Sequence, residues 1–265
     1  MIPIRELKAK ARELGVPPST IERDYAQNWL LAHLDSLKMA LKGGTGIKKV
    51  FIDGYRFSDD LDFTLVENYG EDQIQAALAG ALAETRDESG IQFRDTVDLN
   101  ETKSGFRANV YFNIIQSGSQ NPIGIHIDIT DKNNEEILLP LLELPIFHDY
   151  SDQLETKVTS YSLEEIMGEK IRSVFQRTRP RDLYDIRHIA PQVDRDAVGS
   201  ILQRKCQLKG IRLDIQTLQE KRSKFSAGWV TSLHHQVRDI PDFNESFEMM
   251  ISEIDFYYKT FILQE

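Results

Sequence analysis

Two aspartates, Asp60 and Asp62, are separated by one residue, in a segment whose second half resembles a β-strand. Successive side chains of a strand point to opposite faces, so both carboxylates would leave the same face. Two like charges side by side repel, and a divalent cation removes that repulsion. Mg²⁺ prefers oxygen ligands and usually keeps substrate phosphates in its coordination shell. The spacing therefore predicts a magnesium site, although an isolated Asp-x-Asp is also typical of a solvated turn.

A third acid, Asp128, lies in a strand predicted over 123–130, where isoleucines alternate with polar residues. A carboxylate among isoleucines is costly unless it is paired or bound to a metal. Three carboxylates on one sheet face can hold two metal ions roughly 3.5–4 Å apart, as in-line phosphoryl displacement requires. We therefore predict Asp60, Asp62 and Asp128 as catalytic residues and as ligands of two Mg²⁺ ions. Asp128 would also take the proton from an acceptor hydroxyl.

A glycine turn, Gly43-Gly44-Thr45, follows a short strand predicted over 38–42 and opens a helix predicted from about 45 to 51. Glycines let a phosphate approach the backbone, and a helix N-terminus presents free N–H groups. We predict Gly43, Gly44 and Thr45, together with Ser58, as nucleotide-binding residues. An ordinary strand-to-helix turn is the competing interpretation. The chain contains neither a P-loop nor a dinucleotide-binding glycine motif.

One lysine, Lys170, falls in the middle of the apolar stripe of a helix predicted over 162–177. It could reach a nucleotide triphosphate, or it could pair with Asp182 or Asp185 from the next helix. Both interpretations can hold in one network. A small basic cluster around Pro180 could contact phosphate or RNA, or it could be a solvated surface.

The remaining pattern predicts an α+β protein. A helix over 18–36 and an Ala- and Leu-rich helix over 71–86 flank strands over 91–98, 106–115 and 123–130. Residues 131–160 are mixed. From residue 162 onward the periodicity is helical, over 162–177, 181–190, 194–207, 212–225 and 244–262. We therefore expect an α/β domain over residues 1–155, which includes the N-terminal helix, and a helical domain over residues 156–265.

The composition limits the class of protein. Lys and Arg total 32 and Asp and Glu total 42, a formal net charge of −10. Such a chain is a poor general nucleic-acid binder, but a local basic groove or a basic protein partner remains compatible with it. The single cysteine excludes an intrachain disulfide. No stretch is apolar and long enough to span a bilayer, and no secretory leader is recognisable. We expect a cytoplasmic protein.

These residues resemble the AbiEii/AbiGii-type toxin nucleotidyltransferases of the DNA polymerase β-like superfamily. The superfamily pattern is a Gly-Gly-or-Ser turn, then Asp-x-Asp, then a third acid on a later strand. The stretches that carry the resemblance are Ile21-Glu22-Arg23-Asp24-Tyr25 before Trp29; Lys42-Gly43-Gly44-Thr45 with Phe57-Ser58-Asp59-Asp60-Leu61-Asp62-Phe63; and Glu169-Lys170-Ile171-Arg172 before Asp182-Leu183-Tyr184-Asp185. Thr45 replaces the serine of many members but keeps the hydroxyl.

The resemblance implies a mixed-sheet nucleotidyltransferase core, a helical C-terminal bundle and a nucleotide triphosphate (NTP) donor with Mg²⁺. It assigns Lys170 and Asp182 to the nucleotide site. It also implies the toxin of a toxin–antitoxin pair, with a winged-helix antitoxin as partner. Some relatives modify the 3′ end of tRNA, which suggests that acceptor here.

Other functions stay open from sequence alone. The chain could be a catalytically idle binding or scaffold protein of a toxin–antitoxin complex. It could transfer the nucleotide to a protein or to a small molecule. A nucleotide-sugar glycosyltransferase also uses Asp-x-Asp, but it normally has a longer α/β region ahead of that motif than the 59 residues present here.

Overall fold

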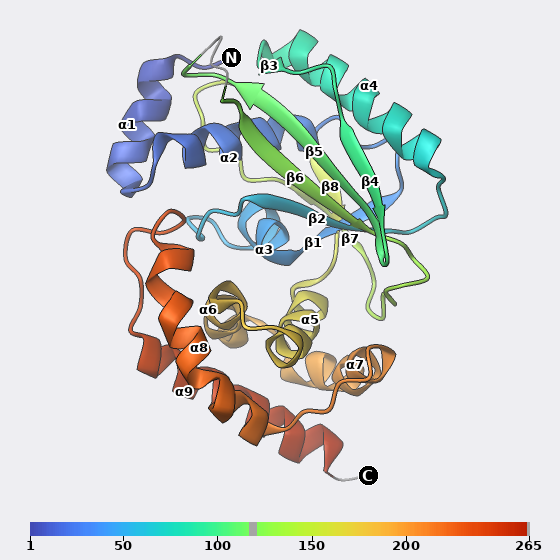
Figure 1. The fold of residues 1–265 in the computed structure, drawn as a ribbon, viewed down its shortest axis with the longest axis vertical. Helices are drawn as coiled ribbons and strands as arrows, with labels where there is room; N and C mark the ends of the chain where they lie inside the picture. The colour runs from blue at the N-terminus through green and yellow to red at the C-terminus, as the bar shows by residue number, and fades with distance from the viewer. Residues whose placement is uncertain (117–120, 264–265) are drawn as a thin grey trace. The chain divides into compact units, whose positions relative to one another are not determined.

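The computed structural model describes residues 1–116 and 121–263, and these residues divide into two compact units (Figure 1). The first unit consists of Met1–Glu135 and Leu141–Ser160, and the second of Glu136–Pro140 and Tyr161–Glu265. The domain boundary predicted after residue 155 falls just ahead of the last strand of the first unit. The predicted domains also include residues 117–120 and 264–265, which lie outside the described residues.

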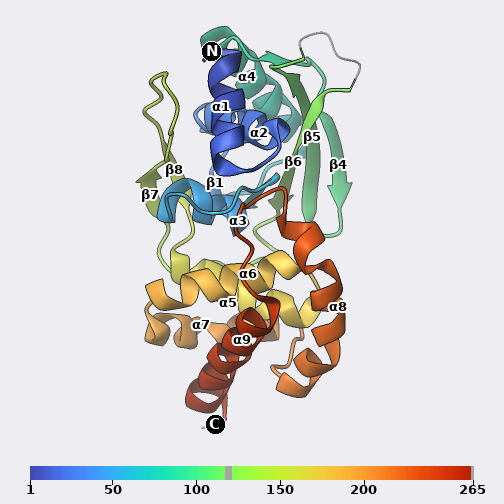
Figure 2. The same cartoon turned by 90° about the vertical axis from the view of Figure 1, so that its left-hand side faces the viewer.

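The first unit opens with two helices that pack together, α1 (Ile4–Leu14) and α2 (Pro18–Leu31) (Figure 2). Pro18 occupies the first turn of α2, where its missing N–H costs nothing because that donor has no helical partner. A longer helix of the same unit, α4 (Glu71–Ser89), ends at Gly90 in a left-handed conformation, which glycine adopts without strain.

The strands described in the first unit form one eight-stranded sheet, in the order β3-β5-β6-β2-β1-β8-β7 with β4 paired to β5. Their bounds are β1 (Met39–Lys42), β2 (Asp60–Leu65), β3 (Gln92–Phe93), β4 (Asp98–Thr102), β5 (Gly105–Asn113), β6 (Ile123–Thr130), β7 (Leu142–Pro145) and β8 (Lys157–Ser160). β2 pairs with β6 and β1 with β8 in parallel, and the other pairs are antiparallel. The predicted mixed sheet is confirmed.

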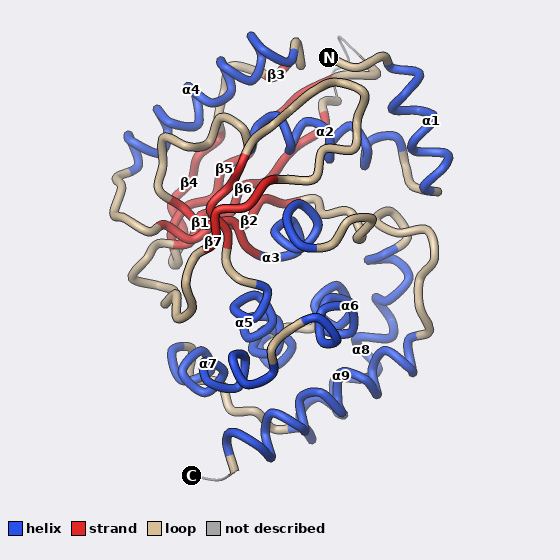
Figure 3. Tube along the Cα trace, turned by 180° about the vertical axis from the view of Figure 1, so that it is seen from behind, coloured by secondary structure: helices blue, strands red, loops and turns tan. Residues whose placement is uncertain are grey.

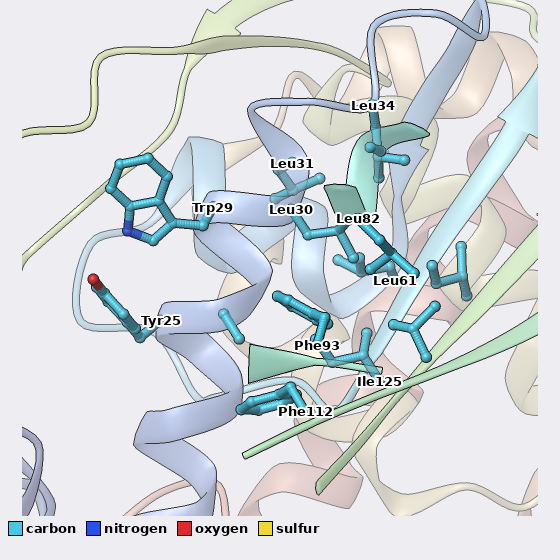
Figure 4. Close-up of a cluster of buried hydrophobic side chains, with 14 of the residues drawn as sticks. Tyr25, Trp29, Leu30, Leu31, Leu34, Leu61, Leu82, Phe93, Phe112 and Ile125 are labelled. Atoms are coloured by element: carbon cyan, nitrogen blue, oxygen red, sulfur yellow. The ribbon is translucent and has the colours of Figure 1, made fainter. Parts of the chain in front are cut away.

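The core lies on the face of the sheet that α2 and α4 cover. Alternate residues of the central strands, such as Leu61, Val110 and Ile127, are fully buried there. Figure 4 shows the helix side chains Leu30 and Leu82 beside the strand residues Leu61, Phe112 and Ile125. Because side chains alternate along a strand, burying this set turns the intervening polar set to the opposite face.

The described part of the second unit contains helices and no strands, as the colouring in Figure 3 shows. Its elements are α5 (Leu163–Gln176), α6 (Pro180–Ile189), the short turn η2 (Ala190–Gln192), α7 (Arg195–Leu208), α8 (Ile215–Leu233), α9 (Phe243–Tyr257) and the π-helical segment η3 (Tyr258–Ile262). Ser162, Asp194, Asp214 and Asp242 cap the starts of α5, α7, α8 and α9 with their side-chain oxygens. The predicted helical C-terminal region is confirmed.

Candidate active site

The three predicted acids lie on two adjacent strands. The parallel register of β2 and β6 places Asp62 beside Asp128 and Asp60 beside His126. Residues opposite one another in neighbouring strands share a face, so the three carboxylates leave the same face of the sheet. Leu61, between the two β2 acids, is fully buried on the other face. The alternation read from the sequence therefore brings these acids together.

Arg107 on β5 binds the third acid directly. The β5–β6 register places Arg107 opposite Asp128. Its Nε donates to Asp128 Oδ1 at 2.6 Å and its Nη2 to Oδ2 at 3.3 Å, so both carboxylate oxygens are engaged. The hydrogen bond to Asp128 raises the pKa of the guanidinium, and the charges of Asp60 and Asp62 add to the effect. A planar guanidinium matches a carboxylate in this way, which makes the pair geometrically specific.

A second cation, Lys42, faces the acids from the other side. The β1–β2 register places the buried Lys42 opposite Asp62. One row across four strands therefore reads Lys42, Asp62, Asp128, Arg107, with two negative charges between two positive ones. The positive charges at the two ends of this row offset part of the repulsion between the adjacent carboxylates.

The glycine turn forms the helix α3 (Gly43–Gly46), which continues as the π-helical segment η1 (Ile47–Phe51). Gly43 has φ +68°, and a Cβ there would stand 2.5 Å from Asp62 Oδ2. A Cβ on Gly44 would stand 3.2 Å from Ser58 Oγ and 2.7 Å from Arg56 Nη2. A side chain at Gly43 would therefore crowd Asp62 of β2, and a side chain at Gly44 would crowd Ser58 and Arg56 in the loop ahead of β2.

Thr45 is buried, and its hydroxyl donates to the carbonyl oxygen of Asp60. This bond ties the glycine turn to the first residue of β2. In this structure the hydroxyl therefore positions the turn against the acids.

The loop ahead of β2 is held by α2. Gln27 Nε2 donates to the carbonyl oxygens of Ser58 and Asp59 at 3.1 and 3.2 Å. Arg23 Nη1 lies 2.7 Å from Asp59 Oδ1. Asp59 is therefore paired with Arg23 in the loop ahead of β2, whereas Asp60, Asp62 and Asp128 share one face of the sheet, which we call the acid face.

Lys170 and Asp182 meet in the second unit. Lys170 Nζ lies 2.8 Å from Asp182 Oδ1 and 2.7 Å from Asp185 Oδ2, and Asp185 is fully buried. Arg177 adds a bond of 2.8 Å from its Nε to Asp182 Oδ2. Burial alone would raise the pKa of Asp182, but Lys170 and Arg177 together hold it below its ordinary value. The pairing considered from sequence is present with both aspartates.

The donor set on the acid face suits a hard divalent cation, because carboxylate oxygens are what Mg²⁺ prefers. Within residues 1–116 and 121–263, no group of three or more His, Cys, Asp or Glu side chains is placed so that it could hold a metal ion. The capture of both Asp128 oxygens by Arg107 is consistent with this. The residue types and their shared face fit Mg²⁺. The third carboxylate, that of Asp128, is bound to Arg107.

Sequence reasoning missed Arg107 and the role of Lys42. In the sequence, Arg107 is spaced by two from Asn109 and by four from Tyr111, and Lys42 directly precedes the glycine turn. Neither signal identifies a partner, because neither strand alone determines the register between two paired strands.

A family model described as nucleotidyl transferase AbiEii toxin, type IV toxin–antitoxin system, matches residues 28–253. The chain belongs to this family. It is therefore a nucleotidyltransferase of the AbiEii toxin class, and membership implies an NTP substrate and an antitoxin partner. The match covers both the acid face of the first unit and the Lys170 network of the second.

Solved structures share the fold. JHP933 from Helicobacter pylori aligns with a TM-score of 0.60 at 16 % identity, over 94 % of this chain and 96 % of its own. MenT4, a nucleotidyltransferase toxin from Mycobacterium tuberculosis H37Rv, aligns with a TM-score of 0.65 at 15 % identity, over 97 % of this chain and 90 % of its own. A search of curated proteins found no match. No helix in the described part of this AbiEii-family chain is long and apolar enough to cross a membrane.

Proposed function

We propose that this AbiEii-family protein transfers a nucleoside monophosphate from an NTP to an acceptor hydroxyl, with two Mg²⁺ ions held by Asp60, Asp62 and Asp128. The observation that carries the proposal is the register that sets Asp62 beside Asp128 and leaves Asp60 on the same face. The glycine turn beside Asp62 supports it, because the absence of a Cβ at Gly43 and Gly44 is the feature that lets a phosphate approach a backbone closely.

The reaction is an in-line displacement at the α-phosphorus. The acceptor oxygen forms a bond to that phosphorus, the bond to the bridging oxygen breaks, and pyrophosphate leaves. Bound Mg²⁺ supplies charge neutralisation and orientation of the triphosphate. We assign removal of the acceptor proton to Asp128, and binding of the triphosphate to Gly43, Gly44, Thr45 and Ser58.

We also assign Lys170 and Asp182 to the nucleotide site. Lys170 carries a positive charge in a buried network with two aspartates, and such a network holds the ammonium in a fixed place. A fixed ammonium can bind a phosphate as a point charge. The assignment is supported by family membership, because the motif Glu169-Lys170-Ile171-Arg172 lies within the matched range.

The acceptor we propose is the 3′ end of tRNA, and the partner a winged-helix antitoxin. Family membership supports a toxin with an antitoxin. With a net charge of −10, RNA binding would depend on a local basic groove, and its affinity would fall with added salt. Transfer to a protein or a small molecule is the main alternative.

The test compares wild type, the double variant Asp60→Ala/Asp62→Ala, and the control Asp98→Ala/Glu101→Ala, which removes two charges from exposed positions of β4. Each protein is incubated with Mg²⁺, labelled NTPs and total RNA, and transfer is measured. We expect transfer by wild type and by the control, loss of transfer in the acid variant, and loss with a chelator. Undiminished transfer by the acid variant would discard the site.

Mass spectrometry of the products identifies the donor and the acceptor, since the mass increment names the nucleotide and the labelled species names the acceptor. Calorimetry with Mg²⁺ and each NTP separates the enzyme from an idle scaffold. A scaffold that acts only by complex formation would show neither transfer nor metal-dependent nucleotide binding.

A further inference from the structure

The pair formed by Arg107 and Asp128 stands at one end of the charged row across the sheet. Its bidentate bonds of 2.6 and 3.3 Å engage both oxygens of the carboxylate that would complete the metal site. A divalent ion at Asp128 would bind the same two oxygens and would meet the positive charge of Arg107. Arg107 and the ion therefore compete for one ligand.

The pair is poorly placed to serve stability alone. The side chains of Arg107 and Asp128 are 55 % and 36 % exposed. Ion pairs this exposed contribute little to folding, because water screens them and ordering the side chains costs entropy. The position of the Arg107–Asp128 pair in the charged row matters more for metal binding than for stability, because Asp62 lies directly beside Asp128.

We propose that Arg107 is a positioning residue. Its guanidinium acts as a counter-cation that holds the Asp128 carboxylate, and it must release this carboxylate before a divalent ion can bind there. The inference rests on the metal site of the proposed function and adds a regulator of its affinity. Before metal binds, Arg107 offsets the repulsion between Asp62 and Asp128 and keeps the third carboxylate on the acid face. Its positive charge at the same time weakens the binding of free divalent ions.

The experiment measures binding of Mn²⁺ alone, without nucleotide, by electron paramagnetic resonance titration of the full chain. The variant is Arg107→Gln, which removes the charge and keeps a polar side chain of similar length. The matched control is Arg94→Gln, which removes the same charge from an exposed arginine of the same unit, whose guanidinium lies 5.8 Å from the Tyr111 ring. A further variant, Arg107→Gln/Asp128→Asn, tests whether any change acts through Asp128.

We expect Arg107→Gln to bind Mn²⁺ about tenfold more tightly than wild type, because the ion gains a carboxylate and loses a neighbouring positive charge. Arg94→Gln should bind Mn²⁺ like wild type, and adding Asp128→Asn should abolish the gain. Unfolding midpoints of each variant show whether the protein is folded in the assay.

Unchanged or weaker binding by Arg107→Gln overturns the inference, as does a gain of the same size in Arg94→Gln. If wild-type Mn²⁺ binding is lost in Asp60→Asn/Asp62→Asn but is unaffected by Arg107→Gln, the metal site stands and only the role of Arg107 fails. If no protein of the series binds Mn²⁺, both the inference and the proposed metal site fail.

Discussion

Gly43 shows how one residue can decide the geometry of the acid face. It combines a positive φ with a position where a Cβ would approach Asp62 Oδ2 to 2.5 Å. Gly54 provides a matched comparison, because it has the same φ of +68° with nothing within 4 Å of an added Cβ. The two glycines therefore separate backbone strain from crowding of the acid.

We predict that Gly43→Ala lowers nucleotidyl transfer strongly, whereas Gly54→Ala leaves it near wild type. Both variants should lose about 1–2 kcal/mol of stability, the cost of a left-handed conformation for alanine. Gly43→Ala alone also has to displace the Asp62 carboxylate. Urea unfolding and the transfer assay measure the two effects. Equal activities of the two variants would show that contact with Asp62 is unimportant.

The acids could be located from the sequence, but their partners could not. Alternation along β2 and β6 fixes which side chains share a face, and the structure agrees for Asp60, Asp62 and Asp128. Arg107 reaches Asp128 from a strand 21 residues earlier, through a register that depends on how the strands pair. The catalytic and metal-binding roles of these three acids stay predictions. So do the nucleotide-site assignments of Gly43, Gly44, Thr45, Ser58, Lys170 and Asp182.

At the scale of elements, long periodic segments were predictable and short irregular ones were not. Helices α4, α5 and α6 and strand β6 lie within a few residues of the predicted ranges. The range 91–98 instead holds the two-residue β3 and the first residue of β4. Strands β7 and β8 fall in a region that read as mixed, because they are short, Pro140 and Pro145 interrupt the pattern, and their pairing depends on distant residues.

Two glycines in helix interiors should respond in opposite ways to alanine. Gly80 of α4 is exposed, with nothing within 4 Å of an added Cβ. Gly199 of α7 lies under the ring of Phe261 from η3, with ring carbons 2.5 Å from an added Cβ. The tight approach of the C-terminal segment to α7 therefore depends on glycine at position 199.

We predict that Gly80→Ala raises the free energy of unfolding by about 0.5–1 kcal/mol, since alanine has the higher helix propensity. Gly199→Ala should lower it by about 1–3 kcal/mol, the usual cost of overpacking. Urea unfolding measures both, and hydrogen exchange over 255–263 reports whether η3 leaves α7. A Gly199→Ala protein that gains stability like Gly80→Ala would contradict this packing.

At the scale of the whole molecule, the family and the fold class were accessible from the order of motifs, and the family match and the shared fold confirm them. The identity of the acceptor substrate could not be predicted from the sequence. Acceptor choice depends on a surface built from several elements and on its local charge, and a net charge of −10 describes only the average. Each unit also contains a buried ion pair between an aspartate and a lysine, and these pairs make the stability of the molecule depend on pH.

Each unit buries an aspartate whose pKa lies below its ordinary value of 3.8. Burial opposes ionisation of Asp24 in the first unit, but the charges of Lys49, 2.7 Å away, and Lys48, with hydrogen bonds from Lys49 and Tyr150, lower its pKa by more. Asp182 in the second unit is held in the same way by Lys170 and Arg177. Glu22 in the first unit acts in the opposite sense, because burial raises its pKa above 4.5. The second unit therefore gives the cleaner measurement.

The folded state binds a proton at Asp182 less readily than the unfolded chain does. Its contribution to stability is therefore fully present above the ordinary pKa of an aspartate and is lost as the pH falls through the lowered folded value. We predict that Asp182→Asn loses about 3 kcal/mol at pH 7, because Lys170 and Arg177 lose a charged partner at a buried site. The loss should shrink as the pH falls toward 3.

The chain allows the second unit to be followed by itself. Its two tryptophans are Trp29 in the first unit and Trp229 in the second. In a Trp29→Phe background, urea unfolding followed by Trp229 fluorescence reports the second unit from pH 7 to pH 3. The control Asp239→Asn removes an exposed carboxylate of the same unit and should follow the parent protein at every pH. A constant difference between Asp182→Asn and the parent protein across this range would mean that the Asp182 side chain contributes through packing rather than through its charge. The charge network would then not be the source of any acid sensitivity of the second unit.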